Sequence, residues 1–421
     1  MSTTQLIPMA LKALTPDAWL LFATRFARLF AYGSLSVILV FYLLGLGLTE
    51  VQSGLVLTLT LAGDVVVSLL LTTRADRVGR RRMLVLGAIL MAAAGLAFAS
   101  TRNLFFLILA GTIGVISPSG NEVGPFLSIE QAALTHIVPA TARTEIFAWY
   151  TLAGSLATAL GALFGGLVTQ ALQQTSLSAV ASYRAVVLVY AALGILLAFL
   201  FTRLSALVEV GAVPEDIVPA ASVATVFGIT RSRNVVLRLS SLFALDSFAG
   251  GFVVQSFAAY WFYLRFGVAP ATLGAIFFWA NVFAGISALV ATRLAARIGL
   301  VRTMVFTHLP SNILLILVPL MPNLSLAVLL LLLRFSISQM DVPARQSYTM
   351  AVVPAAERSA AGGFTGVART TGAAISPLFV GFLFAKPSLI NAPFFLAGTL
   401  KITYDLLLYY SFRILRPPEE Q

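Results

Sequence analysis

The chain contains no cysteine and only two histidines among its 421 residues. The lack of cysteine excludes disulfides and thiolate metal sites, and two histidines do not favour a His-based metal centre. Charged residues are scarce too: they form 10% of the chain, against about 25% in a soluble domain. So few charges cannot cover a water-facing surface, and we expect the chain to lie in a lipid bilayer.

The sequence also lacks the motifs of several classes of enzyme and pump. No Gly-rich Walker loop, no Ser/His/Asp arrangement and no metal-ligand cluster occurs in the sequence. The chain is therefore not expected to be an enzyme or an ATP-driven pump, and no cofactor is expected. The first 16 residues lack a long apolar segment with a small-residue cleavage site, so no cleaved signal peptide is expected.

Apolar residues are abundant, at 59% of the chain. Structures that span lipid are helices or closed barrels, and barrel strands alternate in polarity over segments of about ten residues. The chain has continuous apolar runs instead, such as 185–202 and 324–333. The sequence therefore predicts an all-α membrane protein.

A helix needs about 20 mainly apolar residues to span a bilayer, and the apolar runs give twelve predicted transmembrane helices in two groups of six. They lie near 18–47, 53–73, 83–100, 104–134, 144–171, 183–203, 236–264, 271–294, 303–321, 324–352, 359–385 and 389–412. The polar stretch 204–235 is predicted to be a cytoplasmic linker between two six-helix bundles, 1–203 and 236–421.

The two predicted bundles repeat one another in sequence. Residues 130–166 match 345–381 at an offset of 215, each passing through a Val-Pro pair followed by an Arg. Residues 54–82 match 274–302 at an offset of 220. Homologous halves in the same order are typical of transporters built from parallel repeats around a central cavity.

The net charge of +11 has a distribution that does not favour a nucleic-acid partner. Of the 27 Lys and Arg residues, only Lys12, Lys386 and Lys401 are Lys, and most Arg lie in short loops such as 74–82. This is the positive-inside pattern of membrane proteins. It predicts that both termini lie on the cytoplasmic side of the cell (plasma or inner) membrane.

The loop 72–84 reads Thr-Thr-Arg-Ala-Asp-Arg-Val-Gly-Arg-Arg-Arg-Met-Leu. It resembles the signature between helices 2 and 3 of the major facilitator superfamily, although Thr72 and Arg74 depart from that signature. Residues 161–166 are similar to a helix 5 motif of the drug/proton antiporters, with Ala162 in place of its proline. The resemblance implies a monomer that works by alternating access and whose spans 1, 4, 7 and 10 line a central cavity.

The same loop supplies predicted gating residues. Gly79 permits a tight turn, and a carboxylate is stabilised near a helix N-terminus and guanidinium groups. A second predicted gate consists of Glu130 and Arg345. The repeat relates these two residues, and both are expected to lie close to the cytoplasmic edge. The predicted gating residues are Asp76, Arg77, Gly79, Arg80, Glu130 and Arg345.

Ionisable side chains inside spans are costly and are functional candidates. Burial favours the neutral form of a carboxyl group and a nearby Arg favours the charged form, so such a group can bind and release a proton. The predicted proton-coupling residues are, in order, Glu122, Asp341 and Asp64. Glu122 ranks first because 117–125 is rich in helix breakers, which are tolerated at membrane depth only beside protein or a cavity.

A further group of polar side chains is predicted to contact substrate. Arg28 and Asp246 occupy related positions at an offset of 218, and they are hypothesised to pair across the cavity in one state. Several cavity Arg would suit a carboxylate or phosphate. The predicted substrate-binding residues are Arg28, Asp246, Arg334, Asn121, Arg25, Tyr32 and Gln255.

The leading hypothesis is a secondary active transporter that exports a small organic, amphipathic molecule against inward proton flow. The alternative is a proton symporter or uniporter that imports an organic anion, which the Arg residues at membrane depth favour. A receptor or membrane enzyme is the third class, and no motif supports it. The expected partners are a small-molecule substrate, protons and lipid; the substrate's identity and the direction of transport stay open.

Overall fold

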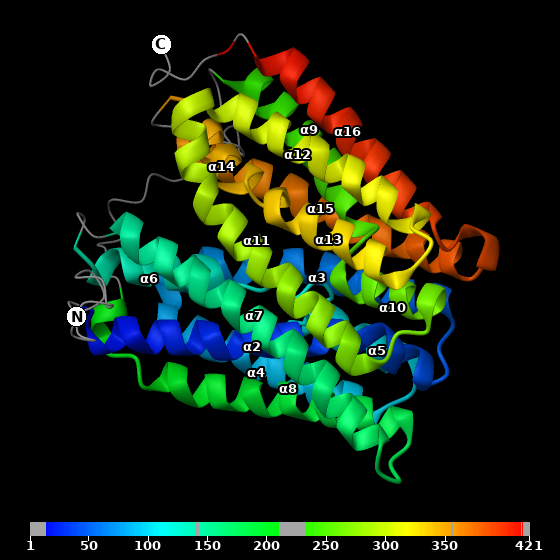
Figure 1. Ribbon diagram of the computed structural model, residues 1–421. Coiled ribbons are helices and arrows are strands. Elements are labelled where there is room, and N and C mark those ends of the chain that lie inside the picture. The colour runs from blue at the N-terminus through cyan, green and yellow to red at the C-terminus, as the bar shows by residue number, and fades with distance from the viewer. Residues whose placement is uncertain (1–13, 140–142, 210–231, 355–356, 414, 416–421) are drawn as a thin grey trace, which may run out of the picture.

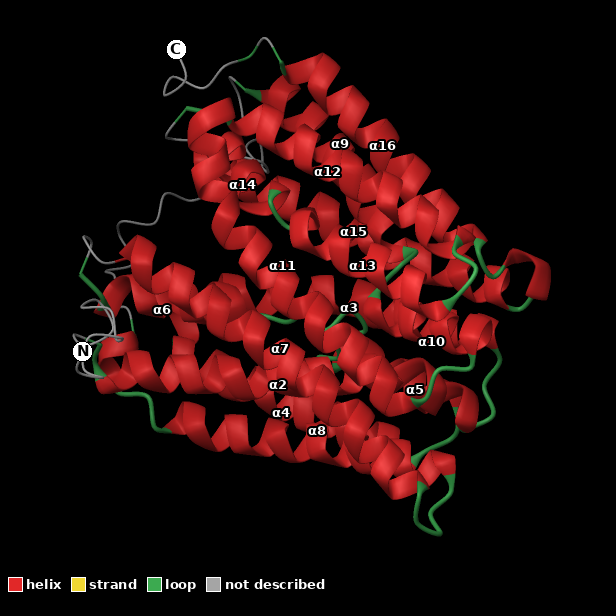
Figure 2. Cartoon of the chain, in the orientation of Figure 1, coloured by secondary structure: helices red, strands yellow, loops and turns green. Residues whose placement is uncertain are grey.

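The computed structural model describes residues 14–139, 143–209, 232–354, 357–413 and 415. These residues form helices joined by loops, and no strand occurs among them (Figure 2). Ten of the helices in these ranges are long and apolar enough to cross a membrane. The predicted all-α membrane fold is confirmed.

The helices fall into two bundles, and each predicted span has a helical counterpart (Figure 1). The first bundle contains α2 (Pro16–Gly45), α3 (Glu50–Val78), α4 (Arg80–Ser100), α5 (Leu104–Ile113), α6 (Phe126–Ile137), α7 (Arg143–Gln173) and α8 (Ala179–Thr202). The second contains α9 (Arg233–Gly251), α10 (Gln255–Phe266), α11 (Pro270–Ile298), α12 (Leu300–Leu317), α13 (Leu324–Ser338), α14 (Asp341–Ala351), α15 (Arg358–Phe384) and α16 (Ala392–Phe412). Short 3₁₀ turns occur at Ala206–Val208, Val318–Leu320 and Pro387–Leu389.

Local sequence explains where several helices begin and end. Thr49 and Gln52 form a capping box that starts α3, which satisfies backbone donors that a helix leaves free at its N-terminus. Gly79 has φ +114 and forms the turn from α3 into α4. Gly299 has φ +88 and forms the same turn from α11 into α12. The offset of 220 relates these two glycines, so the repeat extends to backbone conformation.

Three of the spans expected to line the cavity are interrupted. Span 4 consists of α5 and α6 with the non-helical segment 114–125 between them, which contains Pro118, Gly120 and Gly124. Span 7 breaks between α9 and α10, and span 10 breaks between α13 and α14. Span 1 is the continuous helix α2. The breaks expose backbone polar groups inside the molecule, where neighbouring helices satisfy them.

Glycines bring the two bundles into close contact along two helix pairs, α3 with α15 and α7 with α11. A side chain at Gly54 would collide with the backbone of Pro377 and Gly381, and one at Gly166 would collide with Pro270 and Gly274. Small residues allow helices to approach this closely. The glycines of the helix 5 motif therefore act in helix packing.

Hydrogen bonds between the bundles gather at one end of the molecule. We call the end that holds 74–82 the Arg-rich end. Among the described residues, the bundles are joined at the other end, where Gln255 donates to Ser36 (2.8 Å), Tyr260 to Glu50 (3.1 Å) and the Ala271 amide to Gln170 (3.0 Å). Toward the Arg-rich end the bundles diverge, with α6 and α14 on opposite sides (Figure 1).

The described start of the linker stays with the first bundle. The Glu209 carboxylate accepts hydrogen bonds from the backbone N–H groups of Arg80 (2.6 Å) and Arg81 (3.1 Å) at the start of α4. A carboxylate is stabilised at a helix N-terminus. Most of the predicted linker, residues 210–231, lies outside the described residues.

Candidate transport cavity

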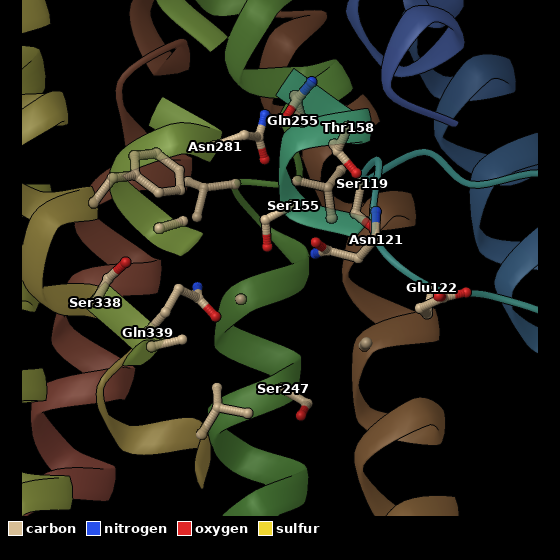
Figure 3. Close-up of a pocket in the computed structure, with 18 of the residues that line it drawn as sticks. Ser119, Asn121, Glu122, Ser155, Thr158, Ser247, Gln255, Asn281, Ser338 and Gln339 are labelled. Atoms are coloured by element: carbon tan, nitrogen blue, oxygen red, sulfur yellow. Dashed lines mark hydrogen bonds between the residues drawn. The ribbon is translucent and has the colours of Figure 1, made fainter. Parts of the chain in front are cut away.

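A cavity of about 470 Å³ lies between the two bundles. Its wall is built from α2, α3, α7, the segment 114–125, and α9 to α16, so both halves contribute. Figure 3 shows polar side chains from several of these elements facing a common space. They include Ser119, Asn121, Glu122, Ser155, Thr158, Ser247, Gln255, Asn281, Ser338 and Gln339.

Two of the broken spans, 4 and 7, meet at the top of this cavity in Figure 3, near Gln255. The Pro118 carbonyl accepts hydrogen bonds from both the hydroxyl (2.6 Å) and the backbone N–H (3.2 Å) of Ser256 at the start of α10. Gln255 itself donates to Ser36 and accepts from Asn281 (3.1 Å). The interrupted backbone of span 4 is thus paired with the interrupted backbone of span 7, which closes the cavity on this side.

Asp64 and Tyr32 lie outside the cavity wall, where they hold the segment 114–125 in place. The Asp64 carboxylate accepts the Gly124 N–H at 2.6 Å and the Ser68 hydroxyl at 3.2 Å. The Tyr32 hydroxyl donates to the Val123 carbonyl at 3.3 Å. Neither residue lines the cavity, so both act on the cavity through the conformation of this segment.

In the first bundle, Arg28 is fully buried between two carboxylates. Its guanidinium lies 2.6 Å from Glu130 and 3.2 Å from Glu122. Glu122 also pairs with Arg25 at 2.8 Å, and Tyr150 donates to Glu130 at 2.5 Å. Arg25 and Glu122 line the cavity, whereas Arg28 and Glu130 lie behind them. In this cluster, the ion pair of Arg25 and Glu122 therefore faces the cavity, and the ion pair of Arg28 and Glu130 is buried inside the bundle.

In the second bundle, Asp246 is the centre of a comparable cluster. Its carboxylate lies 2.5 Å from Lys401 and 3.0 Å from Arg345, and Arg345 also pairs with Asp341 at 3.3 Å. All four side chains line the cavity. Buried charges of opposite sign lower the cost of removing each other from water.

These clusters supply the partners of Arg28 and Asp246 in this structure. The two residues do not pair with each other here, because each has its partner within its own bundle, and their pairing in another state stays a prediction. Glu130 and Arg345 are those partners, and their role as a gate stays a prediction too. The repeat relates Arg28 to Asp246 and Glu130 to Arg345. Both halves thus hold the same ion pair with its charges exchanged.

Two cavity cations differ from the others in having no ionic partner. Arg334 on α13 and Arg369 on α15 line the cavity and are partly buried. Neither makes an ion pair within 4 Å among the described residues, and the Nε atom of each is buried without a hydrogen-bond partner. Arg334 rests against the Phe335 ring at 5.0 Å. The wall thus holds unneutralised positive charge.

The predicted gating loop forms contacts within the first bundle. Asp76 pairs with Arg80 at 2.8 Å, one helical turn away, and Arg80 also donates to the Ala132 carbonyl. Arg77 is exposed, and Gly79 forms the turn described above. No hydrogen bond or ion pair in the described ranges joins this loop to the second bundle.

Sequence reasoning missed several cavity residues. Lys401 and His308 line the cavity, and Asp405 and Asn312 lie directly behind them. A signal was present: 401 and 405, like 308 and 312, are one helical turn apart in otherwise apolar spans, which puts each pair on one helix face.

The predicted cavity residues fall into two sets. Those in the wall are Glu122, Asp341, Arg25, Asn121, Asp246, Gln255, Arg334 and Arg345. Those outside it are Asp64, Arg28, Tyr32 and Glu130, together with the loop residues Asp76, Arg77, Gly79 and Arg80.

A comparison with protein families decides the identity of the fold. The model of the Major Facilitator Superfamily matches residues 21–377, most of the chain. The chain belongs to this superfamily. It is therefore a multi-pass membrane transporter and not an enzyme.

Individual relatives agree with this assignment. The uncharacterized membrane protein YJR124C of Saccharomyces cerevisiae is 33% identical over 423 residues, covering 94% of each chain. The solved structure of a mutant of nucleoside transporter NupG has a TM-score of 0.75 at 13% identity, covering 94% of this chain and all of the other. A D-xylose-proton symporter has a TM-score of 0.70 at 16% identity, covering 93% and 97%. A bacterial homologue of the human lysosomal transporter Spinster, in an inward-facing conformation, has a TM-score of 0.69 at 14% identity, covering 94% of each chain. At these identities the structures are alike in fold alone.

Proposed function

We propose that this protein is a secondary transporter of a small organic anion and works by alternating access. The observation that carries the proposal is the pair Arg334 and Arg369, two cavity cations that have no ionic partner in the described part of the chain. An unpaired charge away from water is costly unless a ligand neutralises it. Arg binds carboxylate and phosphate groups with a planar fork of donors. This arrangement favours the organic-anion hypothesis over the leading prediction of a proton-driven exporter.

The rest of the wall supports an organic ligand of moderate size. A volume of about 470 Å³ lies within the range of about 300–1,000 Å³ usual for small-molecule sites. Phe277, Phe335 and Phe394 add apolar surface to the polar groups. A wall that holds both cations and aromatic rings suits a molecule with an anionic group and an apolar body.

The distribution of contacts supports alternating access. The bundles are bonded together at the end opposite the Arg-rich end, so the cavity is closed there and the bundles diverge at the Arg-rich end. Arg-rich loops face the cytoplasm. We propose that this is the inward-open state of a monomer in a cell membrane, with both termini cytoplasmic. Gradients, and not the fold, then set the direction of transport.

Proton coupling is part of the proposal. Asp341 and Glu122 remain candidates because both line the cavity. Asp64 is a weaker candidate, since its carboxylate is occupied by the Gly124 amide. Proton symport is a property of the D-xylose-proton symporter, a structural neighbour. For this chain, proton coupling is supported by the acidic and basic side chains that line the cavity.

The test is an exchange assay in proteoliposomes without any gradient. Vesicles loaded with an unlabelled aromatic monocarboxylate, an aliphatic dicarboxylate or a phosphate monoester are offered the labelled form, with organic cations and zwitterions in parallel. We expect exchange of at least one anion and none of the cations. Exchange of cations alone would overturn the anion proposal and restore the exporter.

Variants assign the anion site. Arg334→Gln and Arg369→Gln each remove charge-assisted hydrogen bonds worth about 1.5–3 kcal/mol, so the apparent affinity should fall about 10- to 100-fold. Arg334→Lys should recover part of it, because the charge remains while the fork is lost. Arg265→Gln is the matched control, since Arg265 is exposed at the end of α10 and away from the cavity. Unchanged affinity in both Gln variants would exclude these residues from the site.

A further inference from the structure

A buried polar group lies behind the cavity wall of the second bundle, on two helices that pack against each other, α12 and α16. It consists of His308 and Asn312 on α12, and Lys401 and Asp405 on α16. Asp405 is fully buried, and His308 is 4% exposed. His308 also lines the cavity, so it connects the cavity with the acid behind it.

The distances define a chain of acid, imidazole and acid. His308 Nδ1 lies 2.8 Å from Asp405 Oδ1, and His308 Nε2 lies 3.8 Å from Asp246 Oδ1. The Asn312 amide donates to the other Asp405 oxygen at 2.9 Å. Two lone pairs at 2.8 Å would repel one another, so one proton lies between His308 Nδ1 and Asp405. The Asn312 amide nitrogen also lies 3.1 Å from His308 Nδ1, but its shorter bond is the one to Asp405. The Nε2 atom, which faces Asp246 and the cavity, is then the position that can gain a second proton.

The charges around His308 and its two acids favour the binding of that second proton. The groups joined by ion pairs within 4 Å are the acids Asp246, Asp341 and Asp405, the cations Arg345 and Lys401, and His308. With a neutral imidazole this network carries one more negative charge than positive. Net charge is costly in a region shielded from water. A proton on Nε2 makes this ion-paired network neutral, and Arg334 and Arg369, which line the same cavity without joining the network, then stay available to the anion.

We propose that His308 and Asp405 form the proton-binding site of this transporter, and that Asp246 links the site to the anion in the cavity. The inference rests on the proposed anion transport with proton coupling, and it assigns the residues that bind the proton and the direction of the coupling. It places the site on spans 9 and 12, whereas the sequence pointed to Glu122, Asp341 and Asp64.

The elements packed against α12 supply the charges that influence the site. From α9 comes Asp246, from α16 come Lys401, Tyr404 and Asp405, and from α13 comes Arg334. α14 contributes Asp341 and Arg345, and Arg369 on α15 borders the same cavity. The charged residues of α11, Arg293 and Arg297, lie in its last turns toward the Arg-rich end and outside the cavity wall.

The coupling has a definite sign. An imidazolium at His308 gives Asp246 a third positive partner beside Lys401 and Arg345, so these cations become available to an anion near Arg334 and Arg369. The cavity also gains one positive charge. Proton binding therefore strengthens anion binding, and by linkage anion binding strengthens proton binding by the same factor. The proton and the anion then cross together, as in symport.

The first test needs no substrate. The chain has only two histidines, so histidine-labelled protein in nanodiscs gives two sets of imidazole ¹⁵N signals, and His136→Gln leaves those of His308. We expect a neutral His308 protonated at Nδ1 that becomes an imidazolium as pH falls, with a titration that shifts in Asp246→Asn. A His308 protonated at Nε2 when neutral, or one that keeps a single protonation state over the pH range in which the protein stays folded, would overturn the proposal.

The second test uses an anion that wild type exchanges, in vesicles containing the pH dye pyranine. His308→Gln should lose both the anion-dependent proton influx and the accumulation driven by a proton gradient, and the exchange that it retains without a gradient should no longer strengthen as the pH falls. His136→Gln is the matched control, because His136 is exposed at the end of α6, and it should behave as wild type. Proton influx that persists in His308→Gln would overturn the inference.

The two proposals fail in different ways. If wild type exchanges no anion, the proposed function fails, while the imidazole titration still decides the proton site. If wild type exchanges an anion and His308→Gln retains coupled proton movement, the function stands and the proton site is wrong. Asp405→Asn is a second variant, expected to abolish coupling and to alter the His308 tautomer.

Discussion

At the residue scale, the cavity is organised by which charges have partners. Arg28 has no exposed surface and contacts two carboxylates, whereas Arg334 and Arg369 face the cavity with no carboxylate partner among the described residues. An Arg side chain can therefore stabilise the fold in one place and be a candidate ligand in another. The difference is set by the acids nearby and not by the Arg itself.

The buried pair of Arg28 and Glu130 should be essential for stability. Removing one partner of a buried ion pair leaves an uncompensated charge, which costs about 3–5 kcal/mol. Arg28→Gln and Glu130→Gln should each lower the thermal unfolding temperature of the protein in detergent. The double variant should unfold at a higher temperature than either single one, because no charge is then left alone. Arg102→Gln, at an exposed loop position, is the control, and single variants as stable as that control would contradict the prediction.

At the element scale, the cavity depends on helices that stop inside the membrane. The segment 114–125 is held by Asp64, Tyr32 and Ser256, each through the backbone. Backbone groups released by a broken helix must find such partners in lipid. The breaks are therefore fixed features of the wall, and the side chains that hold them are as important as those facing the cavity.

Asp64 offers a direct test of that view. If it acts by accepting the Gly124 N–H, Asp64→Asn should be tolerated, because the amide oxygen can accept the same bond. Asp64→Leu removes the acceptor and should destabilise the protein by about 1–3 kcal/mol, as measured by thermal unfolding. Proton-driven accumulation should survive in Asp64→Asn. Loss of that accumulation in a stable Asp64→Asn protein would instead make Asp64 a proton carrier.

At the scale of the whole molecule, the two bundles meet at one end and diverge at the other. Alternating access requires this asymmetry to reverse, and homologous halves are the architecture in which one bundle rocks against the other around a shared site. The exchanged charges of the two ion pairs show that the repeat keeps a pairing geometry while the residue types change. Each bundle can therefore move as a body with its own buried charges satisfied.

The absence of cysteine makes this asymmetry directly measurable. Ser155→Cys and Ser247→Cys would place one thiol from each bundle in the cavity (Figure 3). In membranes at rest, a membrane-impermeant thiol reagent should modify both from the side of the Arg-rich end and neither from the other side. Wild type, without cysteine, is the control. Rapid modification of both from the opposite side would contradict the inward-open assignment.

Much of the fold followed from sequence because the bilayer imposes simple rules. The thickness of the bilayer sets the number of apolar residues in each span. The sequence repeat at an offset of 215 predicts the two homologous halves. The breaks were visible only in span 4, where prolines and glycines cluster. The break between α9 and α10 has no proline, and it is stabilised by the Pro118 carbonyl of the other bundle.

The site was predictable only in part, for a geometric reason. The sequence by itself determined which side chains lie in the membrane, and a helical period assigns each to a face. A helical period holds only within a continuous helix, so it could not predict that Glu130 and Arg345, which follow breaks, contact Arg28 and Asp246.

Only the tertiary structure decided which helix faces pack against one another. Lys401 and Asp405 reach Asp246 and His308 only because α16 packs against α12 and α9. Helix packing depends on the shapes of many side chains together, and no spacing within one helix encodes its neighbour.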